Sequence, residues 1–239
     1  MMPLSKVSMR NRPGVEIVHK FFSGTGPTYD YMVNLLTIGF DLLWKKKILE
    51  KIPQRSVRII DQACGTGILT LKIARKFPRC RVIGVELREE YLNIAKEKNR
   101  SLKLNNLEFI LGRAEDVLLD DGFDCITSSY LAKYADFGSL IPNAKKMLRD
   151  GGLLIIHDFT YPPSRIFAGI LQLYFKLMQT VGSRNYPQWR RIFYGLPELL
   201  RKTEWVAELI RSLQENDFSH INIEPFTLGV STIITARKL

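Results

Sequence analysis

The stretch Asp61-Gln62-Ala63-Cys64-Gly65-Thr66-Gly67 decides the fold of this chain. The apolar run Val57 to Ile60 precedes it and predicts a short buried strand, and a helical pattern from Ile68 to Phe77 follows it. A side chain at Gly65 or Gly67 would obstruct a tight turn and the close approach of a ligand to the backbone. The order of strand, glycine turn and helix therefore predicts a ligand-binding α/β unit.

Strand and helix patterns alternate after this turn. Further short apolar runs typical of strands lie at Val82–Val85, Leu107–Leu111, Phe123–Thr127, Leu153–Ile156, Ile221–Pro225 and Val230–Ala236. A helix is expected from Arg88 to about Leu104, and Asp150-Gly151-Gly152 is expected to end another that includes Ala144 to Leu148. The short connection Phe226 to Gly229 requires an antiparallel hairpin. We therefore expect an α/β, Rossmann-like, doubly wound sheet of seven strands, mostly parallel with an antiparallel last strand.

Acidic residues near the glycine turn indicate the class of ligand. Glu86 ends the expected second strand, where a carboxylate can accept both hydroxyls of an adenosine ribose. A dinucleotide would need a third glycine where this chain has Thr70, and Asp61 would repel its pyrophosphate. The carboxylate of Asp61 instead suits the ammonium group of a methionine moiety through bridging groups. The cofactor indicated is S-adenosyl-L-methionine, with S-adenosyl-L-homocysteine as its product.

Residues after the third and fourth expected strands are further candidates for cofactor contacts. Arg113, Ala114 and Glu115 follow the third strand, the usual place for groups that touch adenine, and Ser129 ends the fourth beside the methionine part. The alternative for Glu115 is an acid favoured by the dipole at a helix start. Cys64 is expected only to pack in the turn. No metal is expected, because the cysteines and histidines lack the spacing of a zinc site.

Two helical regions lie outside the alternation. Tyr29 to Lys51 has a helical pattern that ends before Pro53, and Arg165 to Val181 has a broad apolar arc with a narrow polar stripe. We expect one methyltransferase domain over residues 1–239. Its expected parts are a helical cap (1–54), a cofactor-binding core (55–160), a helical lid insert (161–217) and a terminal hairpin (218–239).

Composition limits the setting of the protein. The chain has 239 residues, 46% of them hydrophobic, which suffices for one sizeable core. Its three cysteines are expected to be reduced and cytosolic. Met1 to Arg12 has no signal-peptide pattern, and no run reaches the roughly 18 apolar residues of a membrane span. The net charge of +11 favours anionic partners such as phospholipid, RNA or an acidic protein; a plain basic surface is the alternative.

The chain resembles the ubiquinone and menaquinone biosynthesis C-methyltransferases from about Ile17 to Lys238. The matching segments beyond the cofactor motif are Tyr29-Asp30-Tyr31-Met32, Leu43-Trp44-Lys45, Phe123-Asp124-Cys125-Ile126-Thr127, Gly151-Gly152 and Phe159-Thr160-Tyr161-Pro162. The resemblance implies a class I methyltransferase that C-methylates a lipid-like quinol of the demethylmenaquinol or ubiquinone-precursor type. It also implies cofactor contacts by Thr66, Glu86, Arg113, Ala114 and Ser129, with Tyr29 closing over the cofactor.

The chain departs from the family pattern on the expected substrate side. Val33-Asn34 replaces Asn-Asp, Phe40-Asp41 replaces His-Arg, and Lys133-Tyr134 replaces Arg-Asn. Near the end of the fifth strand, His157-Asp158 stands where the family has an aliphatic residue and Glu. The cofactor assignment is unaffected by these departures, and the exact acceptor stays open.

Carbon methylation sets requirements for the catalytic residues. A ring carbon becomes a good nucleophile once the adjacent phenol, with a pKa of about 10, is deprotonated by a base or stabilised by a cation. Lys133 is the candidate cation, or the base itself if burial lowers its pKa. Asp158 or His157 is the candidate base, and Tyr134 orients the phenolic oxygen or walls the pocket. The alternatives are a solvated Lys133 and a hydrogen-bonded structural His157.

The partners follow from the same features. The apolar arc of Arg165 to Val181 fits a lid over a small lipophilic substrate, peripheral contact with a membrane, or a core or homodimer-interface helix. No nucleic acid is expected, because Ser128-Ser129-Tyr130-Leu131 replaces the Asn/Asp-Pro-Pro-Tyr string common in amine-methylating enzymes. The expected location is the cytoplasm, including the inner face of the membrane. Methylation of another small molecule or of RNA, and a catalytically silent cofactor-binding partner in a membrane-associated complex, remain the alternatives.

Overall fold

A seven-stranded sheet in the order β3-β2-β1-β4-β5-β7-β6 forms the centre of the protein. The computed structural model describes residues 13–120 and 122–239, so the expectation for Met1 to Arg12 lies outside the described residues. All neighbouring strands are parallel except β7, which is antiparallel to both β5 and β6. The predicted fold class is confirmed. The strands are β1 (Arg58–Gln62), β2 (Arg81–Glu86), β3 (Leu107–Leu111), β4 (Phe123–Ser129), β5 (Leu148–Phe159), β6 (Phe218–Phe226) and β7 (Ser231–Lys238).

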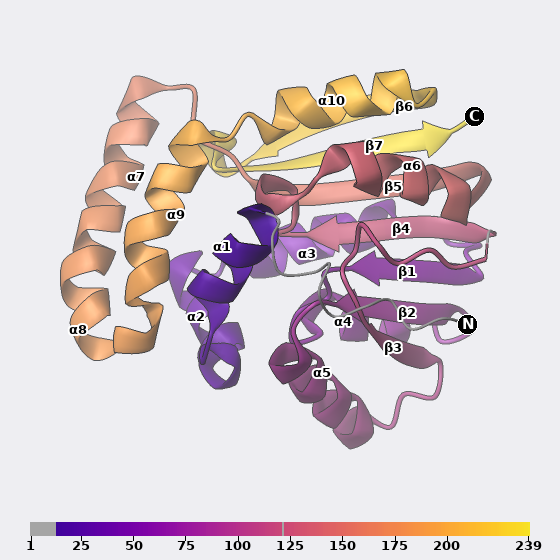
Figure 1. Ribbon diagram of the computed structural model, residues 1–239, viewed down its shortest axis with the longest axis horizontal. Coiled ribbons are helices and arrows are strands. Elements are labelled where there is room, and N and C mark those ends of the chain that lie inside the picture. The colour runs from indigo at the N-terminus through magenta and orange to yellow at the C-terminus, as the bar shows by residue number, and fades with distance from the viewer. Residues whose placement is uncertain (1–12, 121) are drawn as a thin grey trace.

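Helices cover both faces of the sheet (Figure 1). The α-helices of the described chain are α1 (Pro13–Phe22), α2 (Tyr29–Leu36), α3 (Phe40–Lys51), α4 (Ile68–Lys76), α5 (Glu89–Leu102), α6 (Phe137–Met147), α7 (Arg165–Leu177), α8 (Ser183–Asn185), α9 (Arg190–Lys202) and α10 (Trp205–Glu215). The core on one face is shared with α3 and α4, and the core on the other with α6 and α10. Ile59 and Ile60 of β1 belong to opposite faces and are both fully buried, which explains the continuous apolar run of this strand.

A separate cap lies beyond the carboxyl ends of the parallel strands. It has its own apolar core, made by Phe21, Met32, Trp189, Ile192 and Phe193 from α1, α2 and the α9 region. Figure 1 shows α7, α8 and α9 beside α1 and α2 at this end of the sheet. The expected cap and the first part of the expected lid insert therefore pack together, over the edge where α/β sheets bind their ligands.

Several predicted helix boundaries were wrong. The helix expected over Tyr29–Lys51 is two helices, because Ile38 and Gly39 have positive φ angles of 51° and 79° and break it. Gly151-Gly152 does not end a helix, since α6 ends at Met147 and β5 runs through both glycines. The helix expected to reach Val181 becomes a π-helix over Met178–Gly182.

The expected lid insert contains one core helix. Trp205, Leu209 and Leu213 of α10 are buried against the sheet, whereas no residue of α7 is buried. In the described part of the chain, no helix has the length and apolarity needed to cross a membrane.

Candidate active site

The glycine turn connects β1 to α4 as predicted. Gly65 and Gly67 have φ angles of 59° and 85°, in the region that favours glycine. A Cβ on Gly67 would lie 3.2 Å from the side chains of Ala95 and Leu71. Both glycines therefore suit the backbone conformation of the turn, and the absence of a side chain at Gly67 also lets the turn pack closely against α5.

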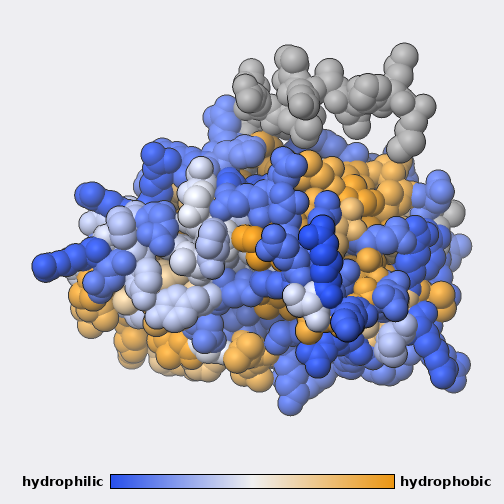
Figure 2. All heavy atoms as spheres, turned by 90° about the horizontal axis from the view of Figure 1, so that it is seen from below, coloured by the Kyte–Doolittle hydropathy of each residue, from blue (hydrophilic) through white to orange (hydrophobic). Residues whose placement is uncertain are grey.

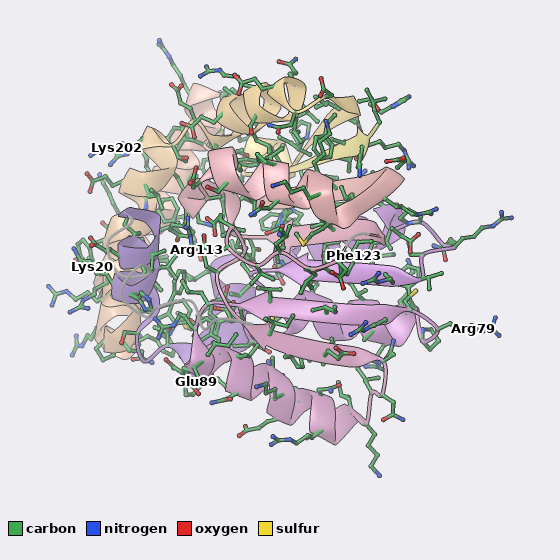
Figure 3. The ribbon with its side chains drawn as sticks, turned by 45° about the vertical axis from the view of Figure 1, so that its right-hand side comes forward. Lys20, Arg79, Glu89, Arg113, Phe123 and Lys202 are labelled. Atoms are coloured by element: carbon green, nitrogen blue, oxygen red, sulfur yellow. The ribbon has the colours of Figure 1, made fainter. Side chains whose placement is uncertain are left out.

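One end of the cleft above this turn presents a carboxylate for a ribose. Glu86 accepts hydrogen bonds from the backbone N–H groups of Gly65 and Arg88, both at 2.8 Å. Burial raises the pKa of Glu86, and these two hydrogen bonds oppose that shift. Arg113 lies beside the same cleft and donates to Glu115 at 3.0 Å. Figure 3 shows Arg113 at the end of the sheet near α1, whereas Arg79 and Phe123 mark the opposite end.

The other end of the cleft presents the carboxyl group of Asp61 and the ammonium group of Lys45. Asp61 is buried and accepts hydrogen bonds from the hydroxyls of Thr70 and Thr127, at 2.5 and 2.7 Å. Burial raises the pKa of Asp61 to about 6. Lys45 lines the same end, and its ammonium donates to the hydroxyl of Ser129 at 2.6 Å. A carboxylate and an ammonium side by side complement the two charged groups of a free amino acid.

The cleft brings together the predicted cofactor-binding residues. Its two adjoining hollows are lined by Tyr29, Asp61, Gly65, Thr66, Glu86, Arg113, Ala114, Glu115 and Ser129. Gly67 is the exception, because it lies at the start of α4 rather than on the cleft surface. These polar side chains fit S-adenosyl-L-methionine. Glu86 suits the ribose, and Asp61 and Lys45 suit the amino-acid end.

A second, apolar cavity of about 360 Å³ adjoins this cleft. It lies between α2, α7, α9 and the carboxyl end of the sheet. The residues that it shares with the cofactor cleft are Phe22, Tyr29, Tyr130 and Tyr134. Among the described residues that line it, Lys133 is the only charged one. The cavity can therefore hold the apolar part of a molecule whose polar end lies next to Lys133.

Lys133 is held in place by Asp158. Its ammonium donates to Asp158 at 2.6 Å and to the carbonyl oxygen of Tyr130 at 3.0 Å. Asp158 also accepts hydrogen bonds from the backbone N–H groups of Lys133 and Phe159. Burial lowers the pKa of Lys133, and the charge of Asp158 opposes this shift. The structure places Lys133 on the cavity and Asp158 behind it, so Asp158 orients the cation.

His157 lies behind the cavity wall. It is fully buried, with Nδ1 2.7 Å from the hydroxyl of Ser129 and Nε2 2.8 Å from that of Ser231. Burial lowers the pKa of His157 well below its ordinary value, and Lys45 and Lys133 lower it further. A neutral ring with both nitrogens hydrogen-bonded has no free position for a substrate proton, so the geometry favours the structural alternative for this residue.

A buried cluster of Asp41, Lys45 and Tyr130 was not predicted from the sequence. Asp41 accepts hydrogen bonds from the Tyr130 hydroxyl at 2.6 Å and from Lys45 at 2.9 Å. Tyr130 has a φ angle of 71°, stacks on Phe159 at 4.8 Å and lines both the cleft and the cavity. An acid and a lysine four residues apart on one side of a helix, next to the apolar Trp44 and Ile48, are the signal that could have predicted this pair.

The fold and the cleft together define the class of the protein, which is an S-adenosyl-L-methionine-dependent methyltransferase. Its fold is similar to a SAM-dependent methyltransferase from Aquifex aeolicus, with a TM-score of 0.57, 16% identity, and coverage of 82% of this chain and 89% of that one. It is also similar to geranyl diphosphate C-methyltransferase from Streptomyces coelicolor A3(2), solved with S-adenosyl-L-homocysteine, with a TM-score of 0.52, 16% identity, and coverage of 83% and 79%.

The sequence comparison narrows the class to one family. The profile of the ubiE/COQ5 methyltransferase family matches residues 8–238, and the chain belongs to this family. Demethylmenaquinone methyltransferase of Staphylococcus aureus (strain MRSA252) is 24% identical over 232 residues, which cover 95% of each chain. The expected methyltransferase activity, cofactor and family are thereby confirmed.

Proposed function

We propose that this methyltransferase transfers a methyl group to a ring carbon of a lipid-like quinol, of the demethylmenaquinol or ubiquinone-precursor type. The observation that carries the proposal is the apolar cavity beside the cofactor cleft, with Lys133 as the only charged side chain on its described wall. A quinol with an isoprenoid tail has the same distribution of polarity, with a polar ring at one end of an apolar molecule. The name of the Staphylococcus aureus relative supports the same acceptor class.

The shared wall of the two sites positions the acceptor ring. The cofactor supplies a methyl group on a sulfonium, and transfer is an in-line displacement that depends on near-attack geometry. The wall between the cleft and the cavity is made by Tyr29, Tyr130 and Tyr134. An acceptor ring held among these tyrosines therefore faces the cleft in which the methyl donor binds. Burial raises the pKa values of all three tyrosines well above the ordinary value, which leaves them neutral walls and hydrogen-bond donors.

Lys133 then activates the ring as a cation. Its ammonium stabilises the phenolate, and Asp158 and the Tyr130 carbonyl fix its direction before the substrate arrives. The phenol proton passes to solvent before attack, and the methyl group leaves the sulfur as its bond to the ring carbon forms. The methylated ring carbon then gives its proton to solvent, and one proton returns to the oxygen to restore the phenol. One proton is released per methyl group transferred.

An acceptor panel tests the proposal. The purified chain is incubated with methyl-labelled cofactor and, separately, a long-tailed demethylmenaquinol, a short-tailed analogue, simple phenols and RNA. We expect label in the quinols, with the lowest KM for the long-tailed one. Label in RNA but not in quinols would contradict the proposal while leaving the methyltransferase assignment intact.

A further inference from the structure

The outer side of α7 exposes a regular apolar stripe. The stripe recurs at helical spacing and comprises Ile166, Ile170, Leu173 and Leu177 of α7 and Val181 of the π-helix that follows. About half to three quarters of each residue is exposed, from 48% for Val181 to 74% for Ile166. The inner side of the same helix lines the cavity with other residues, including Phe167, Leu171 and Phe175. A helix that is apolar on its outward face needs an apolar partner on that face, because such stripes are rarely left in water.

The stripe is continuous with the mouth of the cavity. Ile38, between α2 and α3, is 71% exposed, and Leu228, before β7, is 64% exposed. Both line the cavity, as does Ile170 of the stripe. We call the stripe together with Ile38 and Leu228 the outer apolar face. Figure 2 shows hydrophobic side chains gathered along the lower left edge of the molecule, at the end where the cap and α7 lie.

The segment that carries the stripe has charged side chains of one sign only. Between Asp158 and Glu198 the chain has no acidic residue. The same segment has five basic residues, all exposed: Arg165, Lys176, Arg184, Arg190 and Arg191. A second copy of this basic chain would be repelled, whereas an anionic surface would be attracted to each Lys or Arg near it.

We propose that the outer apolar face docks on the surface of an anionic phospholipid bilayer. The stripe of α7 inserts among the upper acyl chains, and the flanking basic side chains contact the headgroups. The mouth of the cavity then opens toward the membrane interior, so a tailed acceptor enters without crossing water. This proposal goes beyond the proposed function, and it is tested without any methyl acceptor.

Flotation of the full chain with lipid vesicles tests the proposal. The vesicles contain either phosphatidylcholine alone or phosphatidylcholine with phosphatidylglycerol. We expect the chain to float with the anionic vesicles and to bind the neutral ones at least about tenfold more weakly. The variant Leu173→Glu/Leu177→Glu should lose anionic binding by about tenfold or more, because it places two carboxylates on the stripe.

A matched variant separates this face from net charge and from general damage. Leu102→Glu/Leu111→Glu also replaces two exposed leucines, on α5 and β3, and changes the charge equally. We expect it to bind anionic vesicles like the unchanged chain. Cofactor affinity, measured by calorimetry, shows that both variants are folded, since neither changes a residue of the cleft or the cavity.

Three results would overturn the proposal. They are no vesicle binding by the unchanged chain, equal binding to both kinds of vesicle, and equal loss in the two variants. Light scattering tests whether a second copy of the chain binds this face instead. If the unchanged chain is a dimer, the α7 variant is a monomer and no vesicle binding occurs, the face is a dimer interface. None of these results depends on the identity of the methyl acceptor.

Discussion

The cofactor cleft and the apolar cavity share a wall but are built in opposite ways. The cleft is lined by the ends of neighbouring strands, and its charged groups, such as Glu86 and Asp61, are hydrogen-bonded to nearby backbone or hydroxyl groups. The cavity is lined by side chains from distant segments, and Lys133 is the one charged group on its described wall. The cleft therefore defines the reaction that the protein performs, and the cavity defines the molecule that it acts on.

Loss of a carboxylate in the cleft should have the largest effect. Glu86→Ala removes the carboxylate that we expect to accept two ribose hydrogen bonds, and hydrogen bonds to a charged group contribute about 1.5–3 kcal/mol each. We expect cofactor affinity to fall by about 100-fold or more, as measured by calorimetry. Glu50→Ala, on an exposed part of α3, is the control and should bind normally. Unchanged affinity in Glu86→Ala would show that Glu86 does not bind the ribose of the cofactor.

Loss of the cation in the cavity should slow chemistry and spare cofactor binding. We expect Lys133→Met to lower kcat by about 10² or more, the scale of a charge-stabilising group in a buried site. Lys133→Arg should keep part of the activity because it keeps the charge. Asp158→Asn should also slow turnover, because it releases the Lys133 ammonium from its fixed direction. Normal turnover by Lys133→Met would show that the cavity needs no cation.

The pH dependence of cofactor binding should report on Asp61. The pKa of this carboxyl is raised to about 6 in the folded chain, so it loses its charge as the pH falls through that value. Because we expect the charged form to attract the ammonium of the cofactor, affinity should fall below pH 6, by up to about tenfold per pH unit. Calorimetry between pH 5 and 8, at constant ionic strength, measures this. Asp61→Asn should bind the cofactor weakly, and its affinity should not fall further below pH 6. An equal fall in that variant would mean that another group causes the pH dependence.

The two sides of α7 should separate tail binding from membrane contact. Leu171→Ser/Phe175→Ser changes the side that lines the cavity, and each buried methylene is worth about 0.8 kcal/mol. We expect KM to rise several-fold for a long-tailed quinol and little for a short-tailed one. Leu173→Ser/Leu177→Ser changes the exposed side and should leave both KM values unchanged in detergent. The same rise for both tail lengths in the first variant would mean that the tail lies elsewhere.

The cleft could be predicted from the sequence because its residues follow strand ends. Asp61, Glu86 and Ser129 occupy carboxyl ends of parallel strands, which meet at one edge of a sheet once the alternation of elements is recognised. The fold follows from the same alternation. The break between α2 and α3 was missed because Ile38, a poor residue for a positive φ angle, makes the turn together with Gly39.

The cavity could not be predicted to the same depth because it depends on tertiary packing. Asp41 and Tyr130 are distant in the chain, and only the docking of α3 on the sheet end brings them within hydrogen-bond distance. Periodicity showed that α7 is apolar on most sides, but only the structure separates the side of Phe175 from the side of Leu173. Likewise, only the structure shows that Lys133 reaches the cavity and that His157 is buried behind its wall.

The position of the transferred methyl group tests the central claim most directly. A long-tailed demethylmenaquinol is incubated with the chain and methyl-labelled cofactor, and the product is fragmented in a mass spectrometer. If Lys133 stabilises a phenolate whose ring carbon faces the cleft, the label will be found on the carbon next to the phenol oxygen. Label on the oxygen itself would contradict the account, and so would an unlabelled quinol under conditions in which the cofactor binds.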